Sequence, residues 1–445
     1  MTPTPKASGK MNLVRGKPLE PLTVTAWALM LNTVATSVLG LAFWVVASRL
    51  YSPQELGENA ALVSAMILLS TVAQLDLGMG IARLLPQVRQ RRWRPVLGAY
   101  AVTAVIGCGL SAAFLALAPR LSNEFDFLVR DAALGWALIG GVVLWNIFAL
   151  QDAVLTSARW AVAVPVGNAV FGVVKIALMA WLAGRLVEHG VFFGWLAAMV
   201  LVLVPMNMLI FARVLPSARI RGLPQAASAV PLADRRRVVR YLGTDYAAAL
   251  LSQGSTALLP LLVVLVLGRT DNAYFYMAFL VAGAAGALAQ SLSISLLVEG
   301  AYDEAELASL ARRTGLRYLR VIAPGVVLLV AAAPLVLTPF GDAYVANATT
   351  LMRLLLVGTA IHAVIVLYMA VERLRARVSR VLFAEAALVV LIISGALAGM
   401  RANGLVGLGQ AYVASEVIVA VVVAPRLWRI IRPHGAHTRG GHRDG

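Results

Sequence analysis

The chain has 445 residues, of which 60% are hydrophobic and only 13% are charged, and its mean hydropathy is +0.83. A soluble globular protein of this length has no means of burying so much apolar surface, so the composition excludes that class and predicts a polytopic membrane protein. The net charge of +17 would suggest nucleic-acid binding in a soluble chain, and the single cysteine, Cys108, excludes an intrachain disulfide.

Apolar runs of about 20 residues recur along the chain, and each is long enough to cross the hydrocarbon core of a bilayer as a helix. They follow a polar, basic segment at residues 1–22, which we expect to be a cytoplasmic tail rather than a signal peptide. The predicted fold class is all-α, with about 12 transmembrane helices. In chain order the predicted spans are 23–49, 59–83, 96–118, 132–155, 162–184, 191–212, 241–267, 273–298, 320–339, 350–371, 381–400 and 405–424.

The basic residues alternate between the two sides of this topology. With the N-terminus in the cytoplasm, 30 of the 38 Lys and Arg residues fall in inside segments and six in outside segments. The rule that cytoplasmic loops are positive therefore places both termini inside, including a basic C-terminal tail at 425–445 that we expect to be disordered. The charges face the cytosol and anionic membrane lipids, so nucleic acid is not needed to explain them.

The longest segment between predicted spans, residues 213–240, is rich in Pro, Ala and Arg and has six predicted spans on either side. We expect it to be a cytoplasmic linker between an N-terminal lobe, 23–212, and a C-terminal lobe, 241–424. An ordinary cytoplasmic loop is the alternative.

Signatures of catalysis and of ATP hydrolysis are missing from the sequence. It contains no G-x-x-x-x-G-K-[ST], H-E-x-x-H or G-x-S-x-G pattern, so we expect no enzyme activity, no cofactor and no catalytic or structural metal. The outside loops are short, and Glu124 and Asp126 are the only acidic pair there, for which solvated loop carboxylates are the simplest interpretation. Transport is favoured over catalysis.

Residues 32–87 resemble the first two spans of the polysaccharide and lipid-linked oligosaccharide flippases of the multidrug/oligosaccharidyl-lipid/polysaccharide (MOP) exporter superfamily. The resemblance rests on a long first helix, a turn with Tyr51, Pro53 and Gly57, and a second helix that ends in a basic residue. NAYFYMAFLVA, SISLLVEGA and WAVAVPVGNAVFGVVKIALM resemble later spans of the same family.

This resemblance implies two six-helix lobes in a V-shaped, MATE-like fold, with a central cavity that opens alternately to either side. It also implies transport of polyprenyl-pyrophosphate-linked saccharides across the cytoplasmic (inner) membrane for cell-surface polysaccharide synthesis. The Arg-, Ala-, Gly- and Val-rich composition is typical of a bacterial protein. We expect a monomer whose partners are the lipid-linked oligosaccharide, membrane lipids and, as a further candidate, a glycan polymerase.

Lys175 is the only charge in residues 163–184, about 13 residues into its predicted span. Inserting an ammonium group at the middle of a membrane helix costs roughly 2.5–3.5 kcal/mol of free energy, so a structural or functional role is expected for Lys175. A cation in the cavity that meets the substrate pyrophosphate is one reading, and an ion pair that fixes helix packing is the other. Arg49 and Arg353, near the outer ends of spans, and Asn32 complete the predicted substrate-cavity residues.

Three further residues are candidates for coupling to protons or other cations. Asp245 lies near the cytoplasmic end of its span, where a shift of 213 residues pairs it with Asn32. Asp76 lies in the second predicted span, and His362 lies near the middle of the tenth. An interfacial carboxylate, a packing ion pair and a hydrogen-bonded core histidine are the respective structural alternatives.

Other functions stay open at this level. A cation-coupled drug or metabolite antiporter of the same superfamily would have a cavity dominated by acids. A membrane glycan polymerase or ligase would carry catalytic residues on an outer loop, and a scaffold would recruit enzymes through its Arg-rich loops.

Overall fold

The computed structural model describes residues 21–85, 88, 90–158, 160, 162–185, 187–216, 232–299, 304–318, 320, 323–375 and 377–431. The predicted tail at 1–20, most of the predicted linker and residues 432–445 lie outside this part. Asn32 and Asp245 are in described helices, but their side chains lie outside the described set.

The N-terminal half consists of helices that mostly follow the predicted spans. Pro53 occupies the first turn of α2, and Ser52 and Glu55 form a capping box that satisfies the free N–H groups of that turn. The elements are α1 (Pro21–Leu50), α2 (Pro53–Ala73), α3 (Leu77–Leu84), α4 (Trp93–Leu121), η2 (Asn123–Phe125), α5 (Phe127–Arg130), α6 (Ala132–Ser157), α7 (Ala163–Ala183), α8 (Gly190–Leu209) and η3 (Ile210–Val214).

The second predicted span, 59–83, is wrong as a single helix. Leu75 and Asp76 have positive φ angles of 46° and 55°, a left-handed conformation that no right-handed helix accommodates, so α2 ends at Ala73 and α3 is a separate short helix. Asp76 therefore lies outside the second span, at the start of α3.

The C-terminal half begins with two long helices and ends with one that spans two predicted segments. In α16 the predicted break between 400 and 405 corresponds to a turn at Asn403 and Gly404, where Gly404 has φ +54°. The elements are α10 (Leu232–Leu267), α11 (Arg269–Glu299), α12 (Glu304–Arg317), α13 (Ala323–Ala331), α14 (Ala333–Leu337), η5 (Thr338–Phe340), α15 (Asp342–Leu374) and α16 (Val378–Ile431).

The predicted ninth span, 320–339, is also wrong as one straight helix. Ala323–Ala331 and Ala333–Phe340 meet at an angle of 75°, with Pro334 in the first turn after the bend. Proline cannot donate the hydrogen bond that would continue the preceding helix, which accounts for the break.

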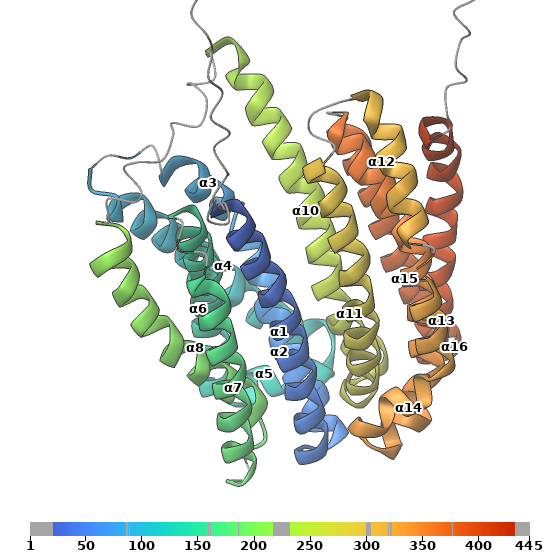
Figure 1. Cartoon of the computed structure of the whole chain (residues 1–445). Coiled ribbons are helices and arrows are strands. Elements are labelled where there is room, and N and C mark those ends of the chain that lie inside the picture. Colours follow the sequence, from blue (N-terminus) through green and yellow to red (C-terminus); the bar gives the residue numbers. More distant parts are fainter. Residues whose placement is uncertain are drawn as a thin grey trace, which may run out of the picture.

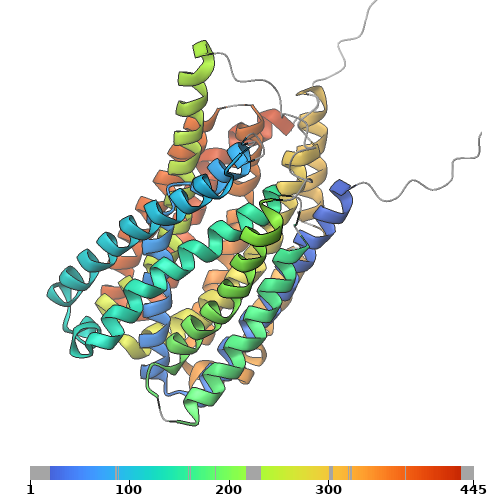
Figure 2. The ribbon, with the colours of Figure 1, turned by 90° about the vertical axis from the view of Figure 1, so that its left-hand side faces the viewer.

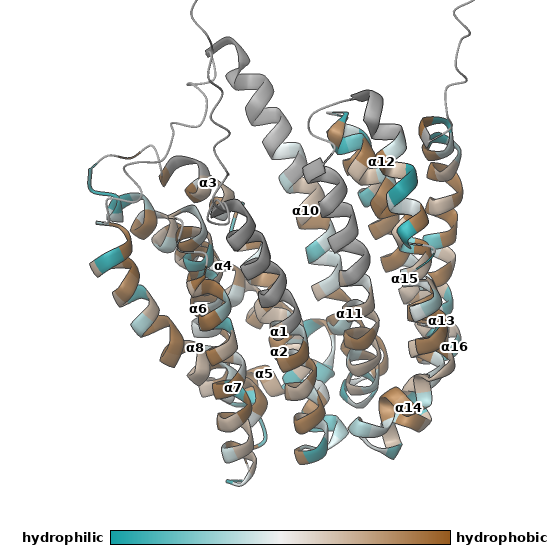
Figure 3. Cartoon of the chain, in the orientation of Figure 1, coloured by the Kyte–Doolittle hydropathy of each residue, from teal (hydrophilic) through white to brown (hydrophobic). Residues whose placement is uncertain are grey.

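Figure 1 shows two groups of long helices side by side, α1 to α8 in one and α10 to α16 in the other. Figure 2, turned by 90°, shows α4, α6, α7 and α8 running obliquely across the near face. Among the described residues, eight helices are long and apolar enough to cross a membrane, or nine if the bent pair counts as one span. The chain is thus a multi-pass membrane protein, and in Figure 3 its hydrophobic residues dominate the middle of the long helices.

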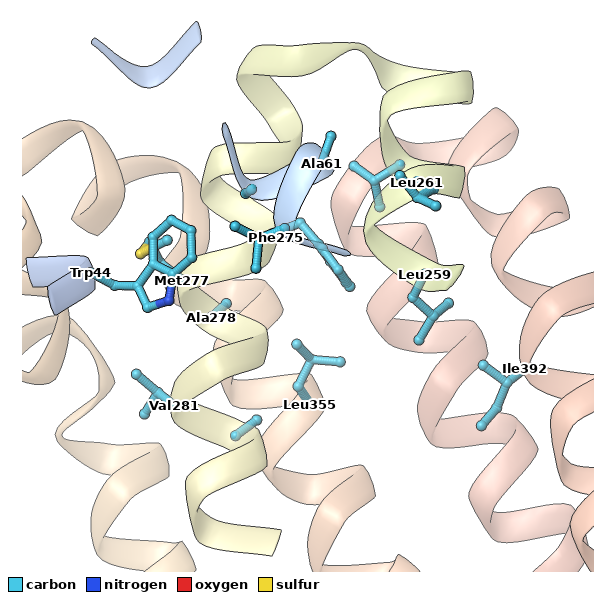
Figure 4. Close-up of a cluster of buried hydrophobic side chains, with 14 of the residues drawn as sticks. Trp44, Ala61, Leu259, Leu261, Phe275, Met277, Ala278, Val281, Leu355 and Ile392 are labelled. Atoms are coloured by element: carbon cyan, nitrogen blue, oxygen red, sulfur yellow. The ribbon is translucent and has the colours of Figure 1, made fainter. Parts of the chain in front are cut away.

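One apolar core runs through both groups at the end where α2 and α11 begin, which we call the outer end because the charge pattern predicts that it faces away from the cytoplasm. Phe275 of α11 is fully buried between α2 and α10 (Figure 4), and Trp44 of α1 packs against Tyr276 of α11 with ring centroids 4.7 Å apart. This shared core holds the two groups together at the outer end.

Candidate functional site

Two adjoining compartments lie between the helix groups. The first has a volume of about 360 Å³ and is lined by α1, α6, α7, α8 and α11, with Lys175 in its wall. The second, of about 420 Å³, is lined by α1, α2, α10 and α11. They share Thr36, Gly40, Tyr276 and Leu280. Among the described residues that line either compartment, Lys175 is the only charged one, so the cavity between the groups has a cationic point in an uncharged wall.

Aromatic rings surround the ammonium group of Lys175, and no carboxylate pairs with it. Its Nζ atom lies 4.0 Å from the ring centroid of Trp195, 4.6 Å from that of Phe43 and 5.1 Å from that of Phe171. In the described part of the chain it has no ion pair, although the side chain is only 6% exposed. Cation–π contacts of ~0.5–2 kcal/mol each offset part of the cost of burial, and the described residues supply no hydrogen-bond acceptor to the ammonium group.

The indole N–H of Trp195 is a second donor in the same wall. It is buried and has no hydrogen-bond acceptor among the described residues. A buried donor that lacks a partner is costly, and the described residues leave this one uncompensated next to Lys175.

Three charged side chains and one histidine close the outer end, and we call them the outer clasp: Glu58, Glu124, Arg269 and His189. Arg269, at the start of α11, donates from Nη1 to Glu58 Oε1 at 2.6 Å and from Nε to Glu124 Oε2 at 2.9 Å. His189 Nε2 lies 3.2 Å from Glu58 Oε2. One arginine of the second helix group is thereby bound to two carboxylates of the first.

Backbone packing tightens the same end. A Cβ atom on Gly57 would overlap the backbone carbonyl of Arg269, so only glycine permits this approach of α2 and α11. Asn272 Nδ2 donates to the Gly57 carbonyl oxygen at 2.8 Å. Arg49 adds a third link, because its Nε and Nη2 atoms donate to the carbonyl oxygens of Pro339 and Thr338, each at 2.6 Å.

The predicted site residues are thus separated by the structure. Lys175 lines the cavity, whereas Arg49 ties the groups together at the outer end. Arg353 is exposed on α15 and donates from Nε to the Val330 carbonyl oxygen at 3.1 Å. Asp76 is exposed at the start of α3. Neither Arg49, Arg353 nor Asp76 is among the residues that line the two compartments.

His362 belongs to a separate polar pair inside the C-terminal group. Its Nδ1 atom lies 3.1 Å from Oε2 of Glu416, which is 1% exposed. Glu385, which is 4% exposed, also interacts electrostatically with His362, and Arg373 interacts in turn with Glu385. The pair connects α15 to the second half of α16.

Sequence reasoning missed the outer clasp and one polar pair beside the cavity. Asn168, which lines the first compartment, donates from Nδ2 to Asp152 Oδ2 at 3.4 Å. The clasp left one trace in the sequence, since Glu58, Glu124 and Arg269 all stand in predicted outer loops, two of them acidic and one basic. Glu124, expected to be a solvated loop carboxylate, is instead bound to Arg269.

No protein-family model and no curated protein matches the chain, whereas solved structures do. An inward-facing multidrug resistance MATE family transporter of the MOP superfamily is 15% identical, with 89% of this chain and 95% of that chain covered and a TM-score of 0.62. The lipid II flippase MurJ, in an inward closed conformation, is 11% identical, with 92% and 90% covered and a TM-score of 0.68.

A third match is a MOP superfamily transporter from Pyrococcus furiosus whose binding pocket is described as having reverse polarity. It is 14% identical, with 94% of this chain and 98% of that chain covered and a TM-score of 0.52. These likenesses confirm the predicted all-α, MATE-like fold. The number of twelve spans, the two-lobe boundaries and the orientation of the termini stay predictions.

Proposed function

We propose that this chain, which has the fold of MOP superfamily transporters, is a flippase for a lipid whose saccharide headgroup is attached through a pyrophosphate. The observation that supports this most is Lys175, a cation without a carboxylate partner in the cavity between the helix groups. We also propose that it acts as a monomer in the inner membrane of a bacterium, beside the polymerase that uses its product.

The proposed cycle follows from the charges. The pyrophosphate enters the cavity while the outer clasp is closed, and Lys175 replaces part of its lost hydration, since an unpaired anion in a low-dielectric site is costly. The polyprenyl chain stays in the lipid. The Arg269 contacts and the Arg49 contacts then separate, the outer end opens, and the headgroup leaves on the other side.

An antiporter for organic cations is less favoured. Such a cavity needs carboxylates, and none lines the two compartments in the described part of the chain. In addition, the faces of Trp195 and Phe171, which would hold a quaternary ammonium, already hold the Lys175 ammonium. A polymerase or ligase has no support from the outer carboxylates, because Glu124 is bound to Arg269.

Reconstitution tests the proposal directly. Vesicles that contain the purified protein and a fluorescent polyprenyl-pyrophosphate disaccharide should show movement of the saccharide between leaflets. Dithionite, which quenches only the label in the outer leaflet, measures this movement. Protein-free vesicles measure the leak, and uptake of a labelled organic cation measures the antiporter alternative. Cation uptake without saccharide movement would contradict the proposal.

We expect Arg269→Ala to favour opening of the outer end by about two- to fivefold, because the partly exposed ion pairs contribute only ~0.5–1 kcal/mol. The measurement is the modification rate of a cysteine placed at Ala61, a buried position on α2 outside the clasp, in a background without Cys108. Arg130→Ala is the matched control, since Arg130 makes an exposed ion pair with Asp126 at 3.8 Å within the first group. An equal effect of both substitutions would argue against a clasp.

We further propose that protons drive transport through the His362–Glu416 pair, because His362 is a predicted coupling residue whose side chain lies beside a buried acid. His362→Gln should abolish the stimulation of flipping by a pH gradient and retain the basal rate. Asp76→Asn is the control for a second of the three candidates. If a pH gradient still stimulates flipping by the His362→Gln protein, the His362–Glu416 pair does not couple protons to transport.

A further inference from the structure

The compartment that contains Lys175 is far richer in aromatic residues than the chain. Phe, Trp and Tyr together make up 7% of the sequence, but six of the 13 residues that line this compartment are aromatic. The six are Trp44, Trp145, Phe148, Phe171, Trp195 and Tyr276.

Most of these rings are occupied or covered. Trp195 and Phe171 hold the Lys175 ammonium, and Trp44 is 2% exposed. Trp145 and Tyr276, in contrast, are only half-buried and stand on opposite helix groups, on α6 and α11. They are the rings that have surface left for a ligand.

Both rings are held in place from behind. Trp145 stacks on Phe148 with ring centroids 5.8 Å apart and an angle of 12° between the planes. Tyr276 packs against Trp44 at 4.7 Å, and its hydroxyl group is hydrogen-bonded to Ser64. A flat surface that keeps its orientation binds a ring-shaped group at low cost in conformational entropy.

The adjoining compartment supplies hydrogen-bonding groups without charge. The hydroxyls of Thr71 and Thr256 donate to their own helices, to the carbonyls of Ile67 at 2.8 Å and Ser252 at 3.0 Å, so their oxygens keep free lone pairs for donors on a ligand. The uncharged polar residues that line this compartment are Thr36, Ser37, Ser64, Thr71, Gln253 and Thr256.

We infer that Trp145 and Tyr276 bind a pyranose ring of the headgroup, the one next to the phosphate at Lys175, and that a further sugar extends toward the hydroxyl groups of the adjoining compartment. This inference rests on the proposed function and adds the saccharide to it. The weakly positive C–H face of a pyranose suits the negative face of an aromatic ring, and its hydroxyl groups suit the uncharged polar wall.

The test compares two lipids on one set of variants. The lipids are a polyprenyl pyrophosphate with a disaccharide and the same polyprenyl pyrophosphate without sugar, each carrying a fluorescent label on the polyprenyl end for binding in detergent. Trp145→Ala should weaken binding of the sugar-bearing lipid by about tenfold and leave binding of the sugar-free lipid unchanged. Trp145→Phe, which keeps a ring, should retain most of the affinity.

Trp136→Ala is the matched control, because Trp136 lies on the same helix, is 72% exposed and does not line either compartment. If Trp145→Ala weakens binding of both lipids equally, or weakens binding of neither, the sugar site is overturned while the proposed flippase function stands. Failure of the wild-type protein to bind either lipid would overturn the proposed function, and the sugar site with it.

Discussion

Lys175→Met is expected to slow movement of a polyprenyl-pyrophosphate saccharide by roughly 10- to 100-fold, the largest effect of any single substitution in the cavity. The estimate follows from the loss of a charged hydrogen bond, which contributes ~1.5–3 kcal/mol. Methionine is unbranched and polarizable, so it fits between Trp195, Phe43 and Phe171, and we expect the folded protein to be retained. The measurement is the initial rate of headgroup movement in reconstituted vesicles.

Lys175→Arg serves as the control for charge. It keeps the cation and its contacts with the aromatic rings, so it should restore a large part of the rate. If Lys175→Met flips the lipid at the wild-type rate, Lys175 is a packing residue. If Lys175→Arg is as slow as Lys175→Met, with equal folded yield, the shape of the side chain rather than its charge is what matters.

Gly57→Ala is expected to prevent closure of the outer end. The added methyl group would overlap the Arg269 carbonyl, and overpacking of this kind costs ~1–3 kcal/mol. The outer-closed arrangement should therefore be depopulated by roughly 5- to 150-fold, with a matching fall in transport. Spin labels at Arg130→Cys on α5 and Asp342→Cys on α15, with Cys108→Ser, would report the change as a longer distance.

Gly109→Ala is the matched control, since nothing lies within 4 Å of a Cβ atom at that position on α4. It should leave both the distance and the transport rate unchanged. A Gly57→Ala protein with the wild-type distance distribution would show that α2 and α11 separate or shift enough to accept a side chain, and the clasp would then lose its backbone component.

Apolar runs gave a close prediction where a helix is uninterrupted. Residues 132–155 were expected as a span, and α6 runs Ala132–Ser157. The prediction failed at Leu75 and Asp76, because neither residue is a glycine or proline that would have indicated their left-handed backbone conformation and the end of the helix. It failed again at Pro334, where a proline that many membrane helices accommodate instead begins a new direction at 75°.

The site was partly accessible to the same reasoning. A lone charge in the middle of an apolar run is enough to single out Lys175, and the structure places it in the wall of the cavity. Its aromatic neighbours come from α1, α7 and α8, so only the packing of helices reveals them. The same holds for the clasp, where Arg269 meets Glu58 and Glu124 across 211 and 145 positions of sequence.

The contact made by Arg49 has a consequence for how the outer end tolerates sequence drift. Its guanidinium group donates hydrogen bonds to the backbone carbonyl oxygens of residues 338 and 339. Every amino acid has such an oxygen. Homologous chains are therefore free to vary at both of these positions as long as the bend before them persists, but an arginine must be kept at position 49. Because a side chain here binds backbone oxygens, an alignment of homologues would show an invariant arginine at position 49 and no position that covaries with it.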